Sequence, residues 1–90
     1  MHPPRITLSR SQAARAVFGN IPTSTYYEWI SQGLLTPGVA LGARSVAWPD
    51  HELQAIAAAR VAGKSDDEIR ALVKQLVADR AQAGREGGVA

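Results

Sequence analysis

The 90-residue sequence contains no cysteine and no long apolar run. Without cysteine it forms neither a disulfide nor a thiolate metal site, a composition that fits a reducing compartment. No apolar stretch approaches the roughly 20 residues of a membrane-spanning helix, and the N-terminus lacks the apolar segment of a signal peptide. We therefore expect a soluble, cytoplasmic protein. It should form one domain, because a chain of this length buries a single modest core, roughly 60–65% of its unfolded surface.

Acidic residues are scarce in the first half of the chain. In residues 1–48 a single acid, Glu28, stands against four arginines: Arg5, Arg10, Arg15 and Arg44. The remainder carries six basic and seven acidic residues, so the net charge of +2 is unevenly placed. This asymmetry predicts a modest positive field on the N-terminal half, which favours a polyanionic partner such as DNA. The alternative is that scattered arginines only keep a small domain soluble.

The sequence also lacks the side-chain combinations that carry catalysis or bind metals. Its two histidines, His2 and His51, lie far apart, and neither belongs to a cluster of cysteines or carboxylates at ligand spacing. There is no paired histidine and carboxylate, and no phosphate-binding glycine loop that leads into a helix. We therefore expect a protein that is not an enzyme and that needs no metal and no cofactor.

The most informative stretch, residues 18–48, predicts a short helix followed by a hairpin. Pro22 precedes a helix over about residues 23–32, whose buried side carries Tyr26, Trp29 and Ile30, and Gly33 ends it. The outer face carries the candidate DNA contacts Thr23, Ser24, Thr25, Tyr27 and Glu28. Hydroxyls in a first helical turn either cap backbone N–H groups or bond DNA, and both roles remain open here.

Two short apolar strands are predicted after this helix, over residues 39–41 and 46–48. Such a hairpin is too short to be stable alone, so we expect it to lean on the helices through Val39, Leu41, Val46 and Trp48. The turn between the strands carries Arg44 and Ser45. Arg44 has no role available in the core. It is either simply exposed to solvent or, as we favour, contacts a phosphate or the minor groove.

Helices are expected on both sides of this unit. Residues 1–7 read as an extended arm in which Arg5 is a candidate phosphate contact. The first helix is expected to open at Ser9, with Gln12 at capping-box spacing, and Arg10 and Arg15 are expected to face solvent or phosphate. Its apolar stripe comprises Ala13, Ala14, Val17 and Phe18. A third helix is predicted from Pro49 and Asp50 to about Ala62.

The sharpest local signal starts the last helix, predicted over residues 63–83. Ser65 and Glu68 have the spacing of a capping box, and the acids there complement the helix dipole. An apolar stripe follows, which either packs on the core of the monomer or joins two protomers. The stripe comprises Ile69, Leu72, Val73, Leu76 and Val77. The glycine-rich residues 84–90 are expected to form a disordered tail.

Residues 21–30, IPTSTYYEWI, resemble the turn and reading helix of AlpA-like prophage regulators and small excisionases, which belong to the MerR-type winged helix-turn-helix group. Gly33, Pro37 and the phrase VALGARSVAW over residues 39–48, similar to the wing of that family, extend the resemblance to about residues 6–60. The resemblance implies a mainly α fold, a winged helix-turn-helix over residues 8–62 with a two-stranded β-hairpin wing. The additional C-terminal helix lies outside the family core and is predicted from its own residues. It also implies sequence-specific binding of double-stranded DNA, with Thr23, Ser24 and Tyr27 toward the groove and Arg44 in the wing.

The function that this resemblance favours is that of an excisionase, or recombination directionality factor. Several copies would bind repeated sites cooperatively, bend the DNA and favour excision of a mobile element by an integrase partner. Relatives commonly carry an arginine or serine at the helix start, where this chain has Pro22 and Thr23, and many carry a basic residue at the position of Glu28. Both departures weaken the phosphate affinity of a lone domain, so cooperative self-association on DNA is expected. The alternatives are a transcriptional regulator of a prophage, and an antitoxin-like interaction module that uses the stripe in the last helix.

Overall fold

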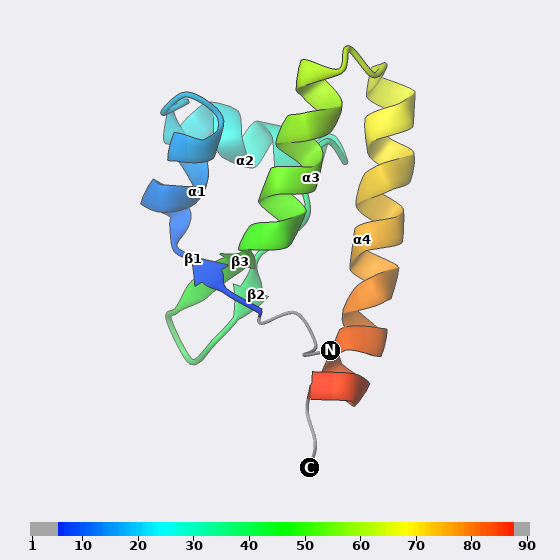
Figure 1. Ribbon diagram of the computed structural model, residues 1–90. Helices are drawn as coiled ribbons and strands as arrows, with labels where there is room; N and C mark the ends of the chain where they lie inside the picture. The colour runs from blue at the N-terminus through cyan, green and yellow to red at the C-terminus, as the bar shows by residue number, and fades with distance from the viewer. Residues whose placement is uncertain (1–5, 88–90) are drawn as a thin grey trace.

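The structure is a computed structural model that describes residues 6–87, with the side chains described as far as residue 82. In this part of the chain, four helices and three short strands follow one another (Figure 1). Their order is β1 (Leu8–Ser9), α1 (Ser11–Val17), α2 (Thr23–Ser31), β2 (Val39–Ala40), β3 (Val46–Pro49), α3 (Asp50–Val61) and α4 (Asp66–Gly87). The fold is mainly helical with a small antiparallel sheet, as the coarse prediction had it. Arg5 and most of the predicted arm lie outside the described residues.

Strand β3 is the centre of the sheet and pairs with the other two strands. The predicted hairpin is present, with Val39 opposite Ala47 and Ala40 opposite Val46. Strand β1 pairs with the other edge of β3 and was not predicted, because the first helix was expected to open at Ser9.

Contacts far away in sequence explain why the chain stays extended at β1. The Ser9 hydroxyl donates to the carboxylate of Asp50, and the Asp50 N–H donates to the carbonyl of Thr7 at 2.7 Å. Helix α1 therefore begins only at Ser11, and its N-cap, Arg10, makes no side-chain capping bond. The predicted capping box of Ser9 and Gln12 is not formed.

The hairpin leans on the helices only at its base. Trp48 is buried and its indole N–H donates to the carbonyl of Thr36 at 2.9 Å. Leu41 and Val46 remain 50% and 42% exposed, so the expectation that they face the core is wrong. Figure 1 shows the reason, since the loop that joins β2 and β3 projects beyond the helices.

Gly38, at the base of the hairpin, is required by close packing. A Cβ atom at this position would lie 2.1 Å from Cγ1 of Val46 and 3.1 Å from the Trp48 ring. No side chain fits there without a shift of its neighbours. Because the side chains of Val46 and Trp48 lie directly over Gly38, the backbone at the start of the hairpin has little freedom to move.

The core lies where α1, α2, α3 and α4 meet the base of the sheet. Tyr26 from α2 packs edge-to-face against Trp48 from β3, with ring centroids 5.0 Å apart. Leu53 and Ile56 from α3 are fully buried beside them. In Figure 1, α3 lies between α1 and α4, and it packs against both. No helix within residues 6–87 is long and apolar enough to cross a membrane.

The apolar stripe of α4 packs largely within the chain. Ile69 and Val73 are buried in the core, and Leu72 and Leu76 lie half-buried against it. Val77 is 37% exposed. Of the two predicted roles, packing within the monomer accounts for Ile69 and Val73, which offer no surface to a second protomer.

The start of α4 has the predicted capping box. The Ser65 hydroxyl accepts from the Glu68 N–H at 3.2 Å, and the Glu68 carboxylate accepts from the Ser65 N–H at 3.1 Å. Hydrogen bonding from Ser65 to the carboxylate, first of all from its backbone N–H, lowers the pKa of Glu68. The helix continues to Gly87, beyond the predicted end at residue 83, so residues 84–87 do not form the expected tail. A single glycine such as Gly84 costs a helix only about 1 kcal/mol and does not end it. Residues 88–90 lie outside the described residues.

Candidate nucleic-acid interface

The first turn of α2 carries exposed hydroxyls that no other group engages. Pro22 is the N-cap, and it provides no side-chain cap. Thr23 and Ser24 are exposed, and their hydroxyls make no hydrogen bond to any residue in the described part of the chain. Thr25 is half-buried. The capping role that the sequence left open is therefore not used by Thr23 or Ser24, and both hydroxyls are available to a partner.

The rest of this outer face comprises Tyr27 and Glu28. Tyr27 is 48% exposed and rests edge-on against Tyr26 and Trp48, with ring centroids 5.6 and 6.2 Å away. Its ring is thus held by the core while one side of it faces solvent. Glu28 is exposed, and its carboxylate accepts from the amide of Gln32 one turn later at 3.2 Å. The carboxylate lies along the helix and has no arginine partner among residues 6–82.

Tyr26 marks the boundary between this face and the core. Its side chain is fully buried, and burial, with the neighbouring Tyr27 as a smaller cause, raises the pKa of its phenol far above the ordinary value. The phenol also has no hydrogen-bond partner in the described part of the protein. Tyr26 is therefore a core residue, and the two adjacent tyrosines have opposite roles.

The loop between β2 and β3, residues 41–45, presents Arg44. The Leu41 N–H donates to the Ser45 carbonyl at 2.7 Å, which closes the loop. Arg44 is exposed, and no acidic side chain within residues 6–82 pairs with it. Ser45 is half-buried, and its hydroxyl lies 3.5 Å from Nη2 of Arg10. Two predicted contacts from distant parts of the sequence, Arg10 and Ser45, are thus brought together.

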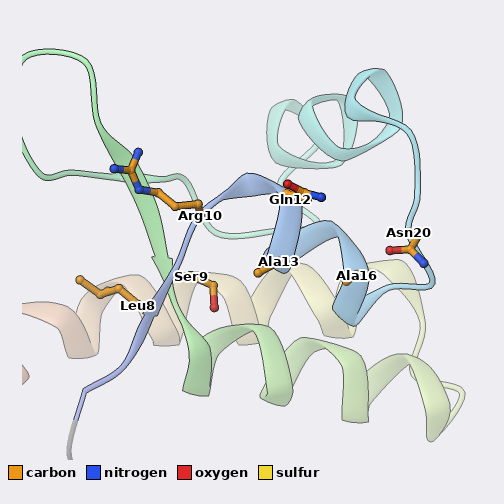
Figure 2. A pocket seen from close by; sticks show the side chains of 7 residues that line it. All are labelled: Leu8, Ser9, Arg10, Gln12, Ala13, Ala16 and Asn20. Carbon is orange, nitrogen blue, oxygen red and sulfur yellow. The ribbon is translucent and has the colours of Figure 1, made fainter.

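Arg10 stands between β1 and α1, next to this loop. Figure 2 shows its side chain extending toward β3, the strand that follows the loop, whereas Ser9 points to the other side, toward α3. The alternation follows from the extended backbone of residues 8–10, in which successive side chains point to opposite faces. The position of β1 therefore directs Arg10 toward the loop, where it meets Ser45.

Arg15 has a structural role that the sequence did not indicate. It is half-buried, and Nη1 donates to the carbonyl of Ile21 across the turn between α1 and α2 at 3.3 Å. This turn contains two residues in the left-handed region, Gly19 and Asn20. Nε of Arg15 is buried without a partner in the described residues. We conclude that Arg15 braces the turn before α2, and that the expectation of an arginine fully turned to solvent is wrong.

An open hollow of about 550 Å³ lies between β1 and α1 (Figure 2). Its lining comprises Leu8, Ser9, Arg10, Gln12, Ala13, Ala16 and Asn20. Ala13, which was expected to face the core, is exposed and lines this hollow, and Ala14 is the buried residue of α1. The amides of Gln12 and Asn20 are polar groups beside Arg10 that sequence reasoning did not assign to a site.

The structure separates paired from unpaired positive charges. In α3, α4 and the turn between them, Arg80 pairs with Glu52, Arg70 with Asp67 and Lys64 with Glu68. Arg60 stacks on the ring of Trp29 at 3.9 Å. Arg10 and Arg44 have no acidic partner in the described part of the chain, and up to residue 82 the same holds for Arg15, Arg60 and Lys74. Three of the five cations of residues 6–82 that lack an acidic partner, Arg10, Arg15 and Arg44, thus belong to the first half of the chain.

Within the described residues, no group of three or more histidines, cysteines or carboxylates is placed to hold a metal ion. No model of a known family matches the chain, and neither a curated protein nor a solved structure matches it. The resemblance to the winged helix-turn-helix group thus rests on the residues quoted for it.

Proposed function

We propose that this protein binds double-stranded DNA, with the outer face of α2 in the major groove and residues 41–45 acting as a wing against the backbone. One observation carries the proposal. The hydroxyls of Thr23 and Ser24 are exposed and unengaged, the exposed Arg10 and Arg44 have no acidic partner within residues 6–82, and Glu28 is the one acid in residues 6–48. Hydroxyls and guanidinium groups are the side chains that bond phosphates and base edges.

The proposed roles follow from side-chain chemistry. A major groove of roughly 12 Å admits one α-helix, and hydroxyls at its first turn then meet base edges. Tyr27, whose ring is held against Trp48, would contact the sugar or a phosphate. Arg44 at the wing and Arg10 beside it would neutralise phosphates and release counterions. Glu28 opposes phosphate binding, and its bond to Gln32 keeps the carboxylate along the helix.

The biological form that we favour is an excisionase-like DNA-bending protein, and this choice comes from the sequence resemblance. A single small module buries only about 600–1,000 Å² on DNA, so several copies at repeated sites give the affinity that one copy lacks. The proposed work is positioning and bending of DNA, without bond chemistry. A transcriptional regulator that uses the same surface is the alternative. An interaction module built on residues 69–77 has less support, because Ile69 and Val73 lie in the core.

The test is a gel-shift titration on DNA that flanks the coding sequence, at two salt concentrations, with circularly permuted probes. We expect stepwise, salt-sensitive shifts whose mobility depends on the position of the site. One discrete shift over a promoter without bending would favour the regulator. No shift at low salt would refute DNA binding and leave the interaction module.

A further inference from the structure

A buried ion pair joins α4 to the first turn of α3. The Glu52 side chain is fully buried, and both of its carboxylate oxygens accept from Arg80, at 2.8 Å from Nε and 2.7 Å from Nη2. Such a two-pronged contact is the strongest arrangement that arginine and a carboxylate make. Arg80 is itself mostly covered by the protein. The pair therefore has a single, well-defined geometry.

Arg80 makes a third bond, to the base of the hairpin. Its Nη2 also donates to the carbonyl of Pro37 at 2.7 Å. Pro37 stands immediately before Gly38, which Val46 and Trp48 cover, and after Thr36, whose carbonyl accepts from the Trp48 indole. The three residues that lead into the hairpin are thus held from one side by Trp48 and from the other by Arg80.

The fold of α4 by itself does not require this link. The last fully buried apolar residue of α4 is Val73, and Arg80 stands roughly 10 Å farther along the helix axis. A buried ion pair often adds little to stability compared with an apolar pair of similar volume. An apolar pair would hold α3 to α4 equally well but would leave the Pro37 carbonyl without its donor. What only arginine supplies here is the connection to the hairpin.

We propose that Arg80 is a positioning residue for the wing, which fixes the base of the hairpin to the first turn of α3 and so sets where Arg44 stands relative to α2. Helix α4 then controls the wing without touching it. The consequence for DNA rests on the proposed function, because it assumes that Arg44 contacts the duplex. The mechanical part, that loss of Arg80 frees the wing, is independent of DNA.

Arg70 offers a matched control within the same helix. It also pairs with a carboxylate, Asp67, and donates to a backbone carbonyl, that of Gln32 at 2.9 Å. Its carbonyl partner lies at the end of α2 and not at the hairpin. Arg70→Met and Arg80→Met therefore each remove one ion pair and one hydrogen bond from α4 to a backbone carbonyl. Only Arg80→Met removes the hydrogen bond to the base of the hairpin.

The first experiment measures wing position without DNA. Because the chain has no cysteine, spin labels attach only to introduced ones. Double electron–electron resonance is recorded for Ala43→Cys with Val61→Cys, which report on the wing and the far end of α3, and for Gln12→Cys with Val61→Cys as a pair outside the wing. We expect Arg80→Met to broaden the first distance distribution about twofold and to leave the second unchanged, and Arg70→Met to leave the first unchanged.

Three results would overturn the proposal: an unchanged first distribution, broadening of both, or equal broadening with Arg70→Met. If Arg80→Met fails to fold, the variant Glu52→Leu with Arg80→Met replaces the ion pair by an apolar pair and still removes the Pro37 link. The same broadening is expected from it.

The second experiment uses a double-mutant cycle to test whether the contribution of Arg44 to DNA affinity depends on Arg80. Fluorescence anisotropy gives Kd for a labelled mixed-sequence duplex. One lost phosphate contact raises Kd about eightfold at about 0.1 M salt, so this is the expected effect of Arg44→Ala in the native chain. In the Arg80→Met background we expect less than a twofold effect, whereas Tyr27→Phe should act equally in both.

Equal effects of Arg44→Ala in both backgrounds would overturn the positioning role. A native protein that does not bind the duplex would refute the proposed function, and the spin-label distances would then decide alone whether Arg80 holds the wing.

Discussion

Removal of the hydroxyls in the first turn of α2 separates a structural role from DNA contact. Thr23→Val keeps the shape of the side chain, and Ser24→Ala removes only the hydroxyl. Neither hydroxyl makes a hydrogen bond in the described part of the protein, and both side chains are exposed. We therefore expect each substitution to change the free energy of unfolding by no more than about 0.5 kcal/mol.

Ser65 provides the internal calibration, because its hydroxyl does cap a helix. It accepts from the Glu68 N–H at 3.2 Å. Replacement of a serine N-cap by alanine costs about 1 kcal/mol, and for a domain of this size 1 kcal/mol lowers Tm by about 4–8 °C. Thermal unfolding followed by circular dichroism should thus show a clear loss for Ser65→Ala and no comparable loss for Thr23→Val.

DNA selectivity should change in the opposite order. A good base contact contributes about 1–3 kcal/mol of discrimination, or roughly a 5- to 150-fold ratio of Kd values between matched and mismatched sites. The preferred site is obtained by selection from a randomised duplex library, and each variant is then titrated against matched and mismatched duplexes. The reasoning is refuted if Thr23→Val lowers Tm as much as Ser65→Ala does and leaves selectivity unaltered.

Three further outcomes follow from the packing. Gly38→Ala should lower Tm, since overpacking costs about 1–3 kcal/mol, and Val46→Ala should remove most of that loss by taking away the Cγ1 atom 2.1 Å from the new Cβ; equal losses in both backgrounds would contradict the clash. Tyr26→Phe and Thr36→Val delete buried hydroxyls without a partner in the described residues, so denaturant unfolding should find stability unchanged or raised by about 1 kcal/mol. Because the folded-state pKa of Glu68 is lowered, its contribution is present above the unfolded-state pKa and is lost as pH falls through the folded-state value; urea midpoints at pH 7 and pH 3 should therefore differ less in Glu68→Gln than in the native protein.

Local signals predicted the elements that depend on neighbouring residues. Helix α2 begins at Thr23 as expected, because Pro22 and the phase of Tyr26, Trp29 and Ile30 determine both its start and its buried side. The start of α4 is predicted equally well by Ser65 and Glu68, whose bonds lie within one turn. The exposure of Thr23, Ser24 and Tyr27 then follows from helical periodicity alone.

The errors arose where a distant residue decides the local conformation. Strand β1 exists because Thr7 and Ser9 bond Asp50, more than 40 positions later. No local pattern in residues 7–10 indicates that partner. The same holds for Arg15, whose hydrogen bond to the Ile21 carbonyl crosses the turn between α1 and α2. It also holds for Arg80, which looks in sequence like an ordinary solvent-facing arginine of an amphipathic helix but bonds the carbonyl of Pro37.

The candidate site shows how charge counting by sequence falls short. The net charge of +2 alone suggests weak attraction to DNA. Yet Arg80, Arg70 and Lys64 are each neutralised by a carboxylate, and Arg60 is held on Trp29. The three ion-paired residues contribute little to the field at a distance, because opposite charges a few ångströms apart nearly cancel at a distance of one Debye length, about 8–10 Å.

Within residues 6–48 the cations without an acidic partner are Arg10, Arg15 and Arg44, and Glu28 is the one acid. Of these three, Arg10 and Arg44 are exposed. A salt titration of DNA binding measures how many phosphate contacts the protein makes, since each contact contributes about 0.9 to the slope of log K against log salt. Arg10→Ala and Arg44→Ala should each reduce the slope by about one unit, whereas Lys64→Ala should leave it unchanged because Glu68 already pairs with Lys64 at 3.8 Å. A slope that falls equally for all three substitutions would mean that the whole surface attracts DNA and that no wing is needed.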